Sequence, residues 1–269
     1  MKEGGDGGAA ARLKNRIEIR DLRIAFGNLD VLRGIDLDIR CGETLCVLGG
    51  SGCGKSVLLK CVAGLLRPDA GSIKVDGEEI VGLDEKTLVE VRKRIGFVFQ
   101  NSALFDSLPV YENVAYPVRE HRKVREAELD KIVADRLALV GLEGVQDKYP
   151  AELSGGMRKR VALARAVAAD PAIVLYDEPT TGLDPTNARR IDLLIRELQR
   201  RLGVTGIVVT HDISSAFTVA DRLALMADGV IRAQGTPDEF RKSHEPLVRE
   251  FLQARPVPTE DFREPRADL

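Results

Sequence analysis

The sequence predicts an α/β fold, because stretches typical of buried strands alternate with a stretch typical of a helix. "AIVLYDEP" at 172–179 and "GIVVTHD" at 206–212 contain near-continuous apolar runs, as parallel strands buried on both faces do. Five apolar residues between them repeat at helical spacing: Ile191, Leu194, Ile195, Leu198 and Leu202. Gly203 then supplies a helix stop. This alternation predicts a layered α/β domain.

The remaining elements are predicted in chain order from local patterns. Within 17–47, the segments "RIEIRDLRIAF", "VLRGIDLDI" and "TLCVLG" indicate short strands. Residues 55–66 are expected to form a helix, and 71–80 a turn-rich pair of strands. After an apparent strand at 95–99, a long section at about 107–168 is expected to be mainly helical.

Both ends of the chain are expected to lie outside the folded domain, which we place at 16–250. Residues 1–15 lack the apolar segment of a signal peptide and are expected to be a disordered lead. The tail at 251–269 combines prolines with mixed charge. It is expected to be a disordered linker, with an arm anchored by Phe262 as the alternative.

Composition narrows the class of protein. The net charge of −2 gives no reason to expect a nucleic-acid surface, and the cluster Arg158-Lys159-Arg160 is expected to be a solvated helix face. The longest apolar runs are far shorter than the roughly 20 residues that cross a bilayer. The four cysteines, at 41, 46, 53 and 61, form no C-x-x-C pair, which argues against zinc and disulfides and favours a reducing compartment.

A glycine-rich loop is the strongest chemical signal. It matches G-x-x-x-x-G-K-[ST] between a predicted strand and a predicted helix, the context of a phosphate-binding loop. The residues are Gly49, Gly50, Ser51, Gly52, Cys53, Gly54, Lys55 and Ser56. Lys55 is expected to reach the β- and γ-phosphates and Ser56 to bind Mg²⁺. Val57 replaces a second hydroxyl but keeps its backbone N–H for a phosphate. Because Cys53 lies beside Lys55 and a helix N-terminus, we expect a lowered thiol pKa.

Three acidic and imidazole side chains follow the two buried strands. Asp177 and Glu178 end the first of these strands, at the edge where such sheets bind ligands. Asp177 is expected to hold Mg²⁺ and Glu178 to polarise an attacking water. Alternatively, the pair caps a turn before Pro179. His211 ends the second strand and is expected to contact the γ-phosphate, although a lone histidine is usually structural.

A second glycine turn opens another predicted helix. It reads Leu153, Ser154, Gly155, Gly156 and Met157. Taken alone, it predicts a helix start with Ser154 as the N-cap. A helix N-terminus of this kind also favours an anion.

Together these motifs resemble the nucleotide-binding subunit of an ATP-binding cassette (ABC) transporter over about 16–250. The resemblance adds a Q-loop glutamine at Gln100, a D-loop at Gly182-Leu183-Asp184 and an adenine-stacking aromatic at Phe26. It implies a P-loop NTPase (RecA-like) core, an antiparallel β subdomain and a helical signature subdomain at about 101–168. Met157 replaces the common glutamine of the signature.

The resemblance also implies a mechanism. Two copies would form a head-to-tail homodimer that sandwiches two ATP molecules, each between Lys55 and Ser56 of one copy and Ser154 and Gly156 of the other. Glu178 would activate water, and His211 would sense the γ-phosphate. The Mg²⁺ ligands would be Ser56, Gln100 and Asp177. Hydrolysis would reopen the dimer.

The stretch "FQNSALFDSLPVYENVAYPVREH" at 99–121 is similar to ATPase subunits of Mla-type intermembrane phospholipid transport. That resemblance implies a separate membrane permease, an MCE-domain lipid-binding protein and, in some members, a STAS-domain protein. The chain would lie on the cytoplasmic face of the inner membrane. Phe105 and Tyr111 are expected near the groove that docks the permease, or alternatively in the core.

Two alternative functions stay open at this point. A cassette for another cargo, such as amino acids, a metal or an organic solute, would carry the same catalytic motifs. A soluble ABC protein of DNA repair or translation is disfavoured, because the chain has one cassette and no long coiled coil between its motifs.

Overall fold

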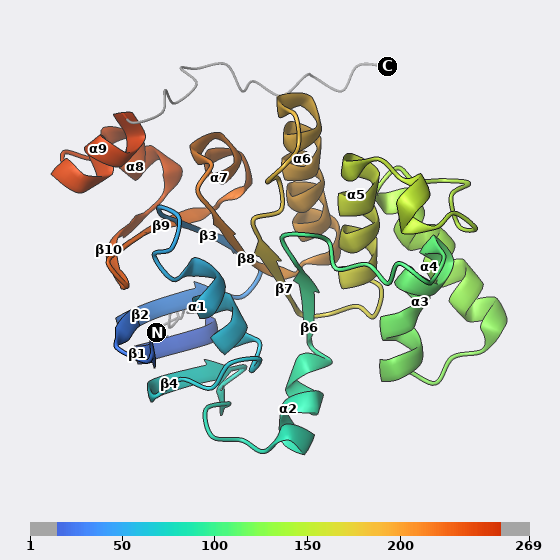
Figure 1. Ribbon diagram of the computed structural model, residues 1–269, viewed down its shortest axis with the longest axis horizontal. Helices are drawn as coiled ribbons and strands as arrows, with labels where there is room; N and C mark the ends of the chain where they lie inside the picture. The colour runs from blue at the N-terminus through green and yellow to red at the C-terminus, as the bar shows by residue number, and fades with distance from the viewer. Residues whose placement is uncertain (1–14, 254–269) are drawn as a thin grey trace, which may run out of the picture.

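A six-stranded sheet forms the centre of the protein, whose computed structural model describes residues 15–253 (Figure 1). The strand order is β10-β9-β3-β8-β7-β6. The strands are β3 (Thr44–Leu48), β6 (Ile95–Val98), β7 (Ile173–Asp177), β8 (Thr205–Thr210), β9 (Arg222–Ala227) and β10 (Val230–Gly235). All pairs are parallel except β10 with β9. Every residue of β3, β7 and β8 is buried, as their apolar runs predict.

A second, antiparallel sheet packs beside the first one. Its order is β2-β1-β4-β5, from β1 (Asn15–Phe26), β2 (Leu29–Arg40), β4 (Ala70–Val75) and β5 (Glu78–Glu79). One face of β1 and β2 is apolar at alternate residues, and its side chains are buried together with α1 (Lys55–Val62). The α1 helix therefore lies in a core shared by the two sheets, and the predicted antiparallel subdomain is confirmed.

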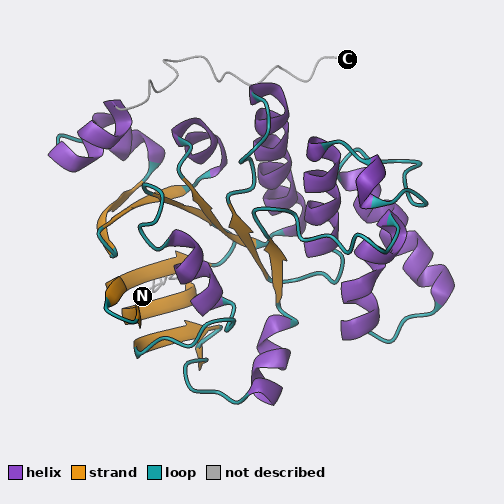
Figure 2. Cartoon of the chain, in the orientation of Figure 1, coloured by secondary structure: helices purple, strands orange, loops and turns teal. Residues whose placement is uncertain are grey.

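Most helices cover the opposite face of the parallel sheet (Figure 2). Helices α3 (Val110–His121), α4 (Glu126–Leu139) and α5 (Gly155–Ala166) pack together, with the short 3-10 helix η1 (Pro150–Glu152) before α5. The other helices are α2 (Glu85–Arg92), α6 (Pro185–Leu202), α7 (Ile213–Val219), α8 (Pro237–Lys242) and α9 (Pro246–Gln253). The α6 helix ends at Gly203, whose positive φ of 64° suits glycine.

The structure corrects three predictions made from the sequence. The helix expected at 55–66 ends at Val62. The tail expected from 251 begins inside α9, where Phe251 and Leu252 pack against the core; residues 254–269, with Phe262, and 1–14 lie outside the described residues. Lys159 is only 6% exposed and so does not belong to a solvated helix face.

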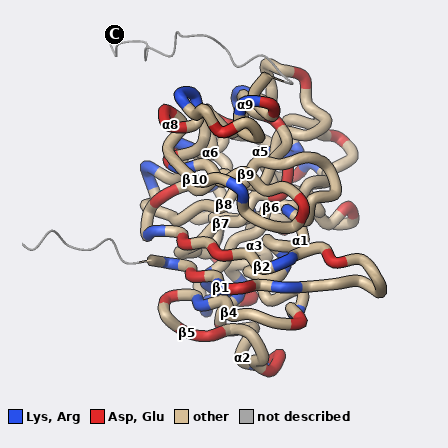
Figure 3. Tube along the Cα trace, turned by 90° about the vertical axis from the view of Figure 1, so that its left-hand side faces the viewer, with Lys and Arg blue, Asp and Glu red and all other residues tan. Residues whose placement is uncertain are grey.

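Charge and hydropathy of the described residues are as follows. Basic and acidic residues are interspersed along the chain (Figure 3). Within residues 15–253, no helix is both long and apolar enough to cross a membrane.

Candidate functional site: a phosphate-binding loop beside a buried carboxylate

The glycine-rich loop connects β3 to α1 and packs tightly against β9. A Cβ atom at Gly49 would lie 2.4 Å from the carbonyl oxygen of Met226 and 2.7 Å from Cys53 Sγ, so only glycine fits there. Gly54 is the N-cap of α1 with φ of 105°, a conformation that glycine adopts without strain. These two glycines bring the loop to the carboxyl edge of the parallel sheet, with the N-terminus of α1 facing it.

Lys55 and Ser56 place a cation and a hydroxyl at this edge. The Lys55 ammonium donates to the carbonyls of Gly49 at 3.0 Å and Gly50 at 2.8 Å, and lies 3.7 Å from Glu178 Oε1. The Ser56 hydroxyl donates to Asp177 Oδ1 at 2.7 Å. The loop lysine and the acidic residues of β7 therefore share one site, although they are far apart in the sequence.

The Ser56 and Asp177 pair fits a magnesium ion that is also bound by phosphate. Both donors are hard oxygen atoms, which Mg²⁺ prefers, and the small number of protein ligands is typical of nucleotide sites. The described residues contain no cluster of three or more His, Cys, Asp and Glu side chains that would hold a metal ion without such help. Gln100 is exposed, and no contact of its side chain with this pair is seen among the described residues.

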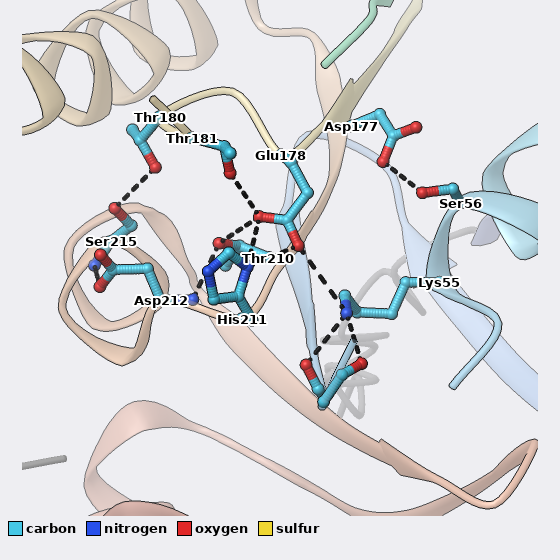
Figure 4. A network of polar contacts seen from close by, with 12 residues as sticks. Lys55, Ser56, Asp177, Glu178, Thr180, Thr181, Thr210, His211, Asp212 and Ser215 are labelled. Carbon is cyan, nitrogen blue, oxygen red and sulfur yellow. Dashed lines mark hydrogen bonds and ion pairs between the residues drawn. The ribbon is translucent and has the colours of Figure 1, made fainter. Parts of the chain in front are cut away.

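Glu178 is the most constrained residue of the site (Figure 4). Its φ of 48° is unusual for a residue with a side chain, and its backbone N–H donates to the carbonyl of Val209. The carboxylate accepts from Thr181 Oγ1 at 3.0 Å and from Thr210 Oγ1 at 3.3 Å. Strain of this kind persists where the surroundings hold a residue in place, and it clusters at active sites.

His211 points at the same carboxylate. Its Nδ1 atom lies 2.9 Å from both oxygens of Glu178. Because a carboxylate only accepts, Nδ1 is the protonated nitrogen, and Nε2 stays available on the other side of the ring. Chemically, the site combines a fixed carboxylate that can take a proton from water, an imidazole that orients it and a cation beside both.

A buried polar network lies beside these groups, and Figure 4 shows its contact between Thr180 and Ser215. The hydroxyls of Thr180 and Ser215 are 3.2 Å apart, and Ser215 also donates to Asp192 Oδ2 at 2.9 Å. Burial raises the pKa of the Asp192 carboxyl to about 7, against its hydrogen bond from Ser215. This network joins α6 and α7 to the segment that follows Glu178. No local pattern in the sequence could indicate this network, because its members are far apart in the chain.

The signature residues lie on a different part of the surface. Ser154 caps α5, accepting from the backbone N–H of Met157 at 3.3 Å, and both Ser154 and Gly155 are exposed. A Cβ atom at Gly156 would lie 3.2 Å from Asn187 Oδ1, next to Asp184, which caps α6. Within the described part of one chain, no contact joins the signature to the glycine-rich loop.

The structure places Phe26 at the end of a strand and Cys53 within the glycine-rich loop. Phe26, at the end of β1, is 50% exposed, and the same hairpin reaches the loop where Leu32 lies against Gly54. The environment of Cys53 was predicted wrongly. Its thiol pKa is raised, because desolvation outweighs the effect of Lys55. Ser51 and Gly52 are exposed, and Val57 packs against the core around α1.

A mainly apolar groove is lined by residues on both sides of Gln100 in the sequence. It is a cavity of about 510 Å³ between α2, β6, α3 and α5. Its wall includes two aromatic pairs, Phe97 with Phe99 at 4.1 Å and Phe105 with Tyr116 at 4.9 Å between ring centroids. Tyr111 does not line the groove, because it faces α4, where its hydroxyl donates to Asp130 at 2.7 Å. Tyr111 instead packs partly buried against the helical core, which was the alternative expected for it.

Asn113 shapes the loop that carries Phe105, and sequence reasoning missed it. Its fully buried amide accepts from the backbone N–H of Phe105 and donates to the carbonyls of Phe105, Leu108 and Pro109. A buried side-chain amide with this many partners fixes the loop geometry. The only signal for it was the asparagine within "ENVAYP".

Comparisons with known proteins agree with this geometry. The sequence profile of the ABC transporter family matches residues 32–181. The intermembrane phospholipid transport system ATP-binding protein MlaF of Haemophilus influenzae is 39% identical, over 95% of this chain and 97% of its own length. The probable ribonucleotide transport ATP-binding protein mkl of Mycobacterium leprae is 43% identical, over 90% of this chain and 70% of its own length.

Among solved structures, a dimeric ATP-binding cassette in a post-hydrolysis state, bound to ADP and Pi, is similar with a TM-score of 0.77 and 32% identity. The match covers 82% of this chain and 98% of that chain. The predicted α/β P-loop fold is thereby confirmed. The chain belongs to the ABC transporter family, as one of its ATP-hydrolysing cassettes.

Proposed function

We propose that this chain powers the movement of phospholipid between membranes through a separate permease. The observation that carries this cargo is the match to MlaF, which extends over 95% of this chain and 97% of that protein. The match to mkl leaves about a third of that relative unmatched, since it covers 70% of its length. We therefore weigh the phospholipid-transport relative more heavily than the ribonucleotide-transport one.

In the proposed hydrolysis, Glu178 is the general base. Its carboxylate is held by Thr181, Thr210 and His211, so that it can accept a proton from the attacking water. Lys55 supplies positive charge for the phosphates, and His211 contacts the γ-phosphate through Nε2. Mg²⁺ would be held by Ser56 and Asp177, with Gln100 joining them, and would supply charge neutralisation at the phosphates.

The working unit is proposed to be a head-to-tail homodimer. Support comes from the exposure of Ser154 and Gly155 and from their separation from the glycine-rich loop of the same chain. The signature of a second copy would complete the site, placing Ser154, Gly155, Gly156 and Met157 against ATP. The similar solved cassette is a dimer. Asp184 and Phe26 are proposed to contact the partner copy and the adenine, respectively.

The groove lined by Phe105 is proposed to receive the permease. It is hollow and mainly apolar, with charged side chains also in its lining, and Asn113 holds the loop of Phe105 in place. An MCE-domain lipid-binding protein, and in some systems a STAS-domain protein, would complete the assembly. The chain would then lie peripherally on the cytoplasmic face of the inner membrane.

Reconstitution tests the cargo directly. The chain and its permease in phospholipid vesicles should show ATP-dependent transfer of a fluorescent phospholipid, and the phospholipid should stimulate ATP hydrolysis. Ribonucleotides, amino acids and divalent metals serve as the comparison cargoes. Stimulation by one of these, with none by phospholipid, would assign the cassette to another cargo.

A further inference from the structure

Lys159 buries its charge beside the catalytic loops. It lies on α5, the helix that begins at the signature, and is 6% exposed. Its ammonium donates to the backbone carbonyl of Gln100 and lies 3.4 Å from that of Glu178. Burial lowers the lysine pKa, while Asp177 and Glu178 act to raise it. A buried ammonium is costly unless its donors are satisfied, so these carbonyl contacts hold it there.

A second cation on α5 secures the same segment. Arg165 donates to the carbonyls of Ser102 and Ala103, both at 2.7 Å. These residues have φ of 64° and 45°, the left-handed region that is strained for side-chain-bearing residues. Two cations of α5, Lys159 and Arg165, thus hold carbonyls of the segment that begins at Gln100. Of these two residues, Lys159 also contacts the backbone of Glu178, the proposed general base.

Glu178 has the same kind of strained backbone, with φ of 48°. Thr181, Thr210 and His211 hold the carboxylate itself. The backbone sets the direction in which the side chain leaves the chain, so a change at the backbone would pull the carboxylate away from these partners. A cation on the carbonyl of Glu178 opposes rotation of the next peptide, which would carry the chain away from this conformation. The contact therefore acts on the orientation of the carboxylate without touching a reacting atom.

We propose that Lys159 is a positioning residue for ATP hydrolysis, which ties the signature helix to the backbones of both Gln100 and Glu178. The inference rests on the proposed role of Glu178 as the general base. When a second copy engages the signature, a shift of α5 is passed through Lys159 to the Q-loop and to the base together. Turnover depends on this link, whereas nucleotide binding by the glycine-rich loop does not.

The experiment compares Lys159→Met, Lys159→Arg and a control on the same helix. Arg160→Met is the matched control, because Arg160 also donates to two backbone carbonyls, those of Val140 and Gly141, away from the catalytic loops. The full chain is assayed for kcat with Mg-ATP and for the affinity of a fluorescent ATP analogue. Assays are run well below the melting temperature of each variant, so that unfolding does not contribute to a lower kcat.

Removing the charge in Lys159→Met should lower kcat about tenfold or more, the scale of one charge-assisted hydrogen bond, with nucleotide affinity within about threefold. Lys159→Arg, which keeps the charge and the donors, should restore kcat to within about threefold of the unmodified chain. Arg160→Met should keep its kcat. This pattern supports a positioning role. Loss of a merely structural lysine would not lower kcat while leaving nucleotide affinity unchanged, and arginine would not restore the kcat.

Two results would overturn the inference. One is an unchanged kcat in Lys159→Met, and the other is an equal loss in Arg160→Met, which would indicate general destabilisation of α5. Glu178→Gln is measured alongside. If it is inactive while Lys159→Met is normal, only the inference fails; if Glu178→Gln hydrolyses ATP normally, the proposed base is wrong and the inference fails with it.

Discussion

Phe105→Ala separates a docking role from a packing role in the groove. Phe105 is 41% exposed, and its ring packs on Tyr116 with the Arg165 guanidinium 5.9 Å from the ring centroid. A fully buried phenylalanine costs about 3–5 kcal/mol when truncated to alanine. Because a large part of this ring is exposed, we expect the free energy of unfolding to fall by only about 1–2 kcal/mol.

Phe105→Ala is expected to lower the affinity for the permease more than it lowers the stability of the chain. An aromatic residue at the centre of an interface contributes about 2 kcal/mol or more, which corresponds to roughly 30-fold in affinity. The assay pairs a thermal melt of the isolated chain with pull-down of the permease and with ATP hydrolysis by the membrane complex. We expect a shift in melting temperature of a few degrees, intact nucleotide binding and a severe loss of pull-down.

Leu193→Ala is the matched control, because Leu193 is an apolar residue with 49% exposure on α6 and does not line the groove. It should leave pull-down unchanged. If Phe105→Ala lowers stability strongly while the permease still binds, the docking assignment is refuted and Phe105 belongs to the core.

Three further predictions concern buried groups. The folded chain binds more protons than the unfolded chain between the ordinary pKa of Asp192 and its raised value of about 7, so stability falls with rising pH there. Asp192→Asn should therefore become more stable relative to the unmodified chain as the pH rises from 5 to 7, by about 1 kcal/mol per pH unit. Urea denaturation at several pH values measures this, and the same pH dependence of the unfolding free energy in both chains would contradict it. Maleimide should inhibit through Cys53, faster as the pH rises and slower with ATP bound, and equal sensitivity of Cys53→Ala would exclude it. Gly49→Ala should lower the melting temperature because its Cβ meets Met226, whereas Gly50→Ala has open space; equal melts would contradict the packing argument.

Local patterns were enough to predict the elements that carry the site. The strands before Asp177 and His211 contain near-continuous apolar runs and are buried, because both faces of the sheet are covered. These runs were therefore recognisable as strands from the sequence. Ser154 could likewise be predicted as an N-cap, since capping depends on residues within one turn. The glycine-rich loop followed from its motif and its flanking elements.

The errors arose where distant segments decide the environment. Lys159 lies in a basic cluster, and only the folding of the Q-loop and of β7 against α5 buries it. Cys53 has a cation nearby, yet the packing of the loop against Met226 of β9 desolvates its thiol, and desolvation prevails. Tyr111 and Tyr116 are close in sequence, but the helical turn of α3 points them to different partners, Asp130 and Phe105.

The most direct test of the central claim is the ATP-hydrolysis rate of Glu178→Gln. The amide keeps the size of the side chain but cannot act as a base, so turnover should fall by about 10² to 10⁴ with ATP binding retained. Size-exclusion chromatography of the same variant with ATP and Mg²⁺ should then show a stable dimer, because the closed state is no longer released by hydrolysis. Hydrolysis at the unmodified rate would remove Glu178 from the mechanism.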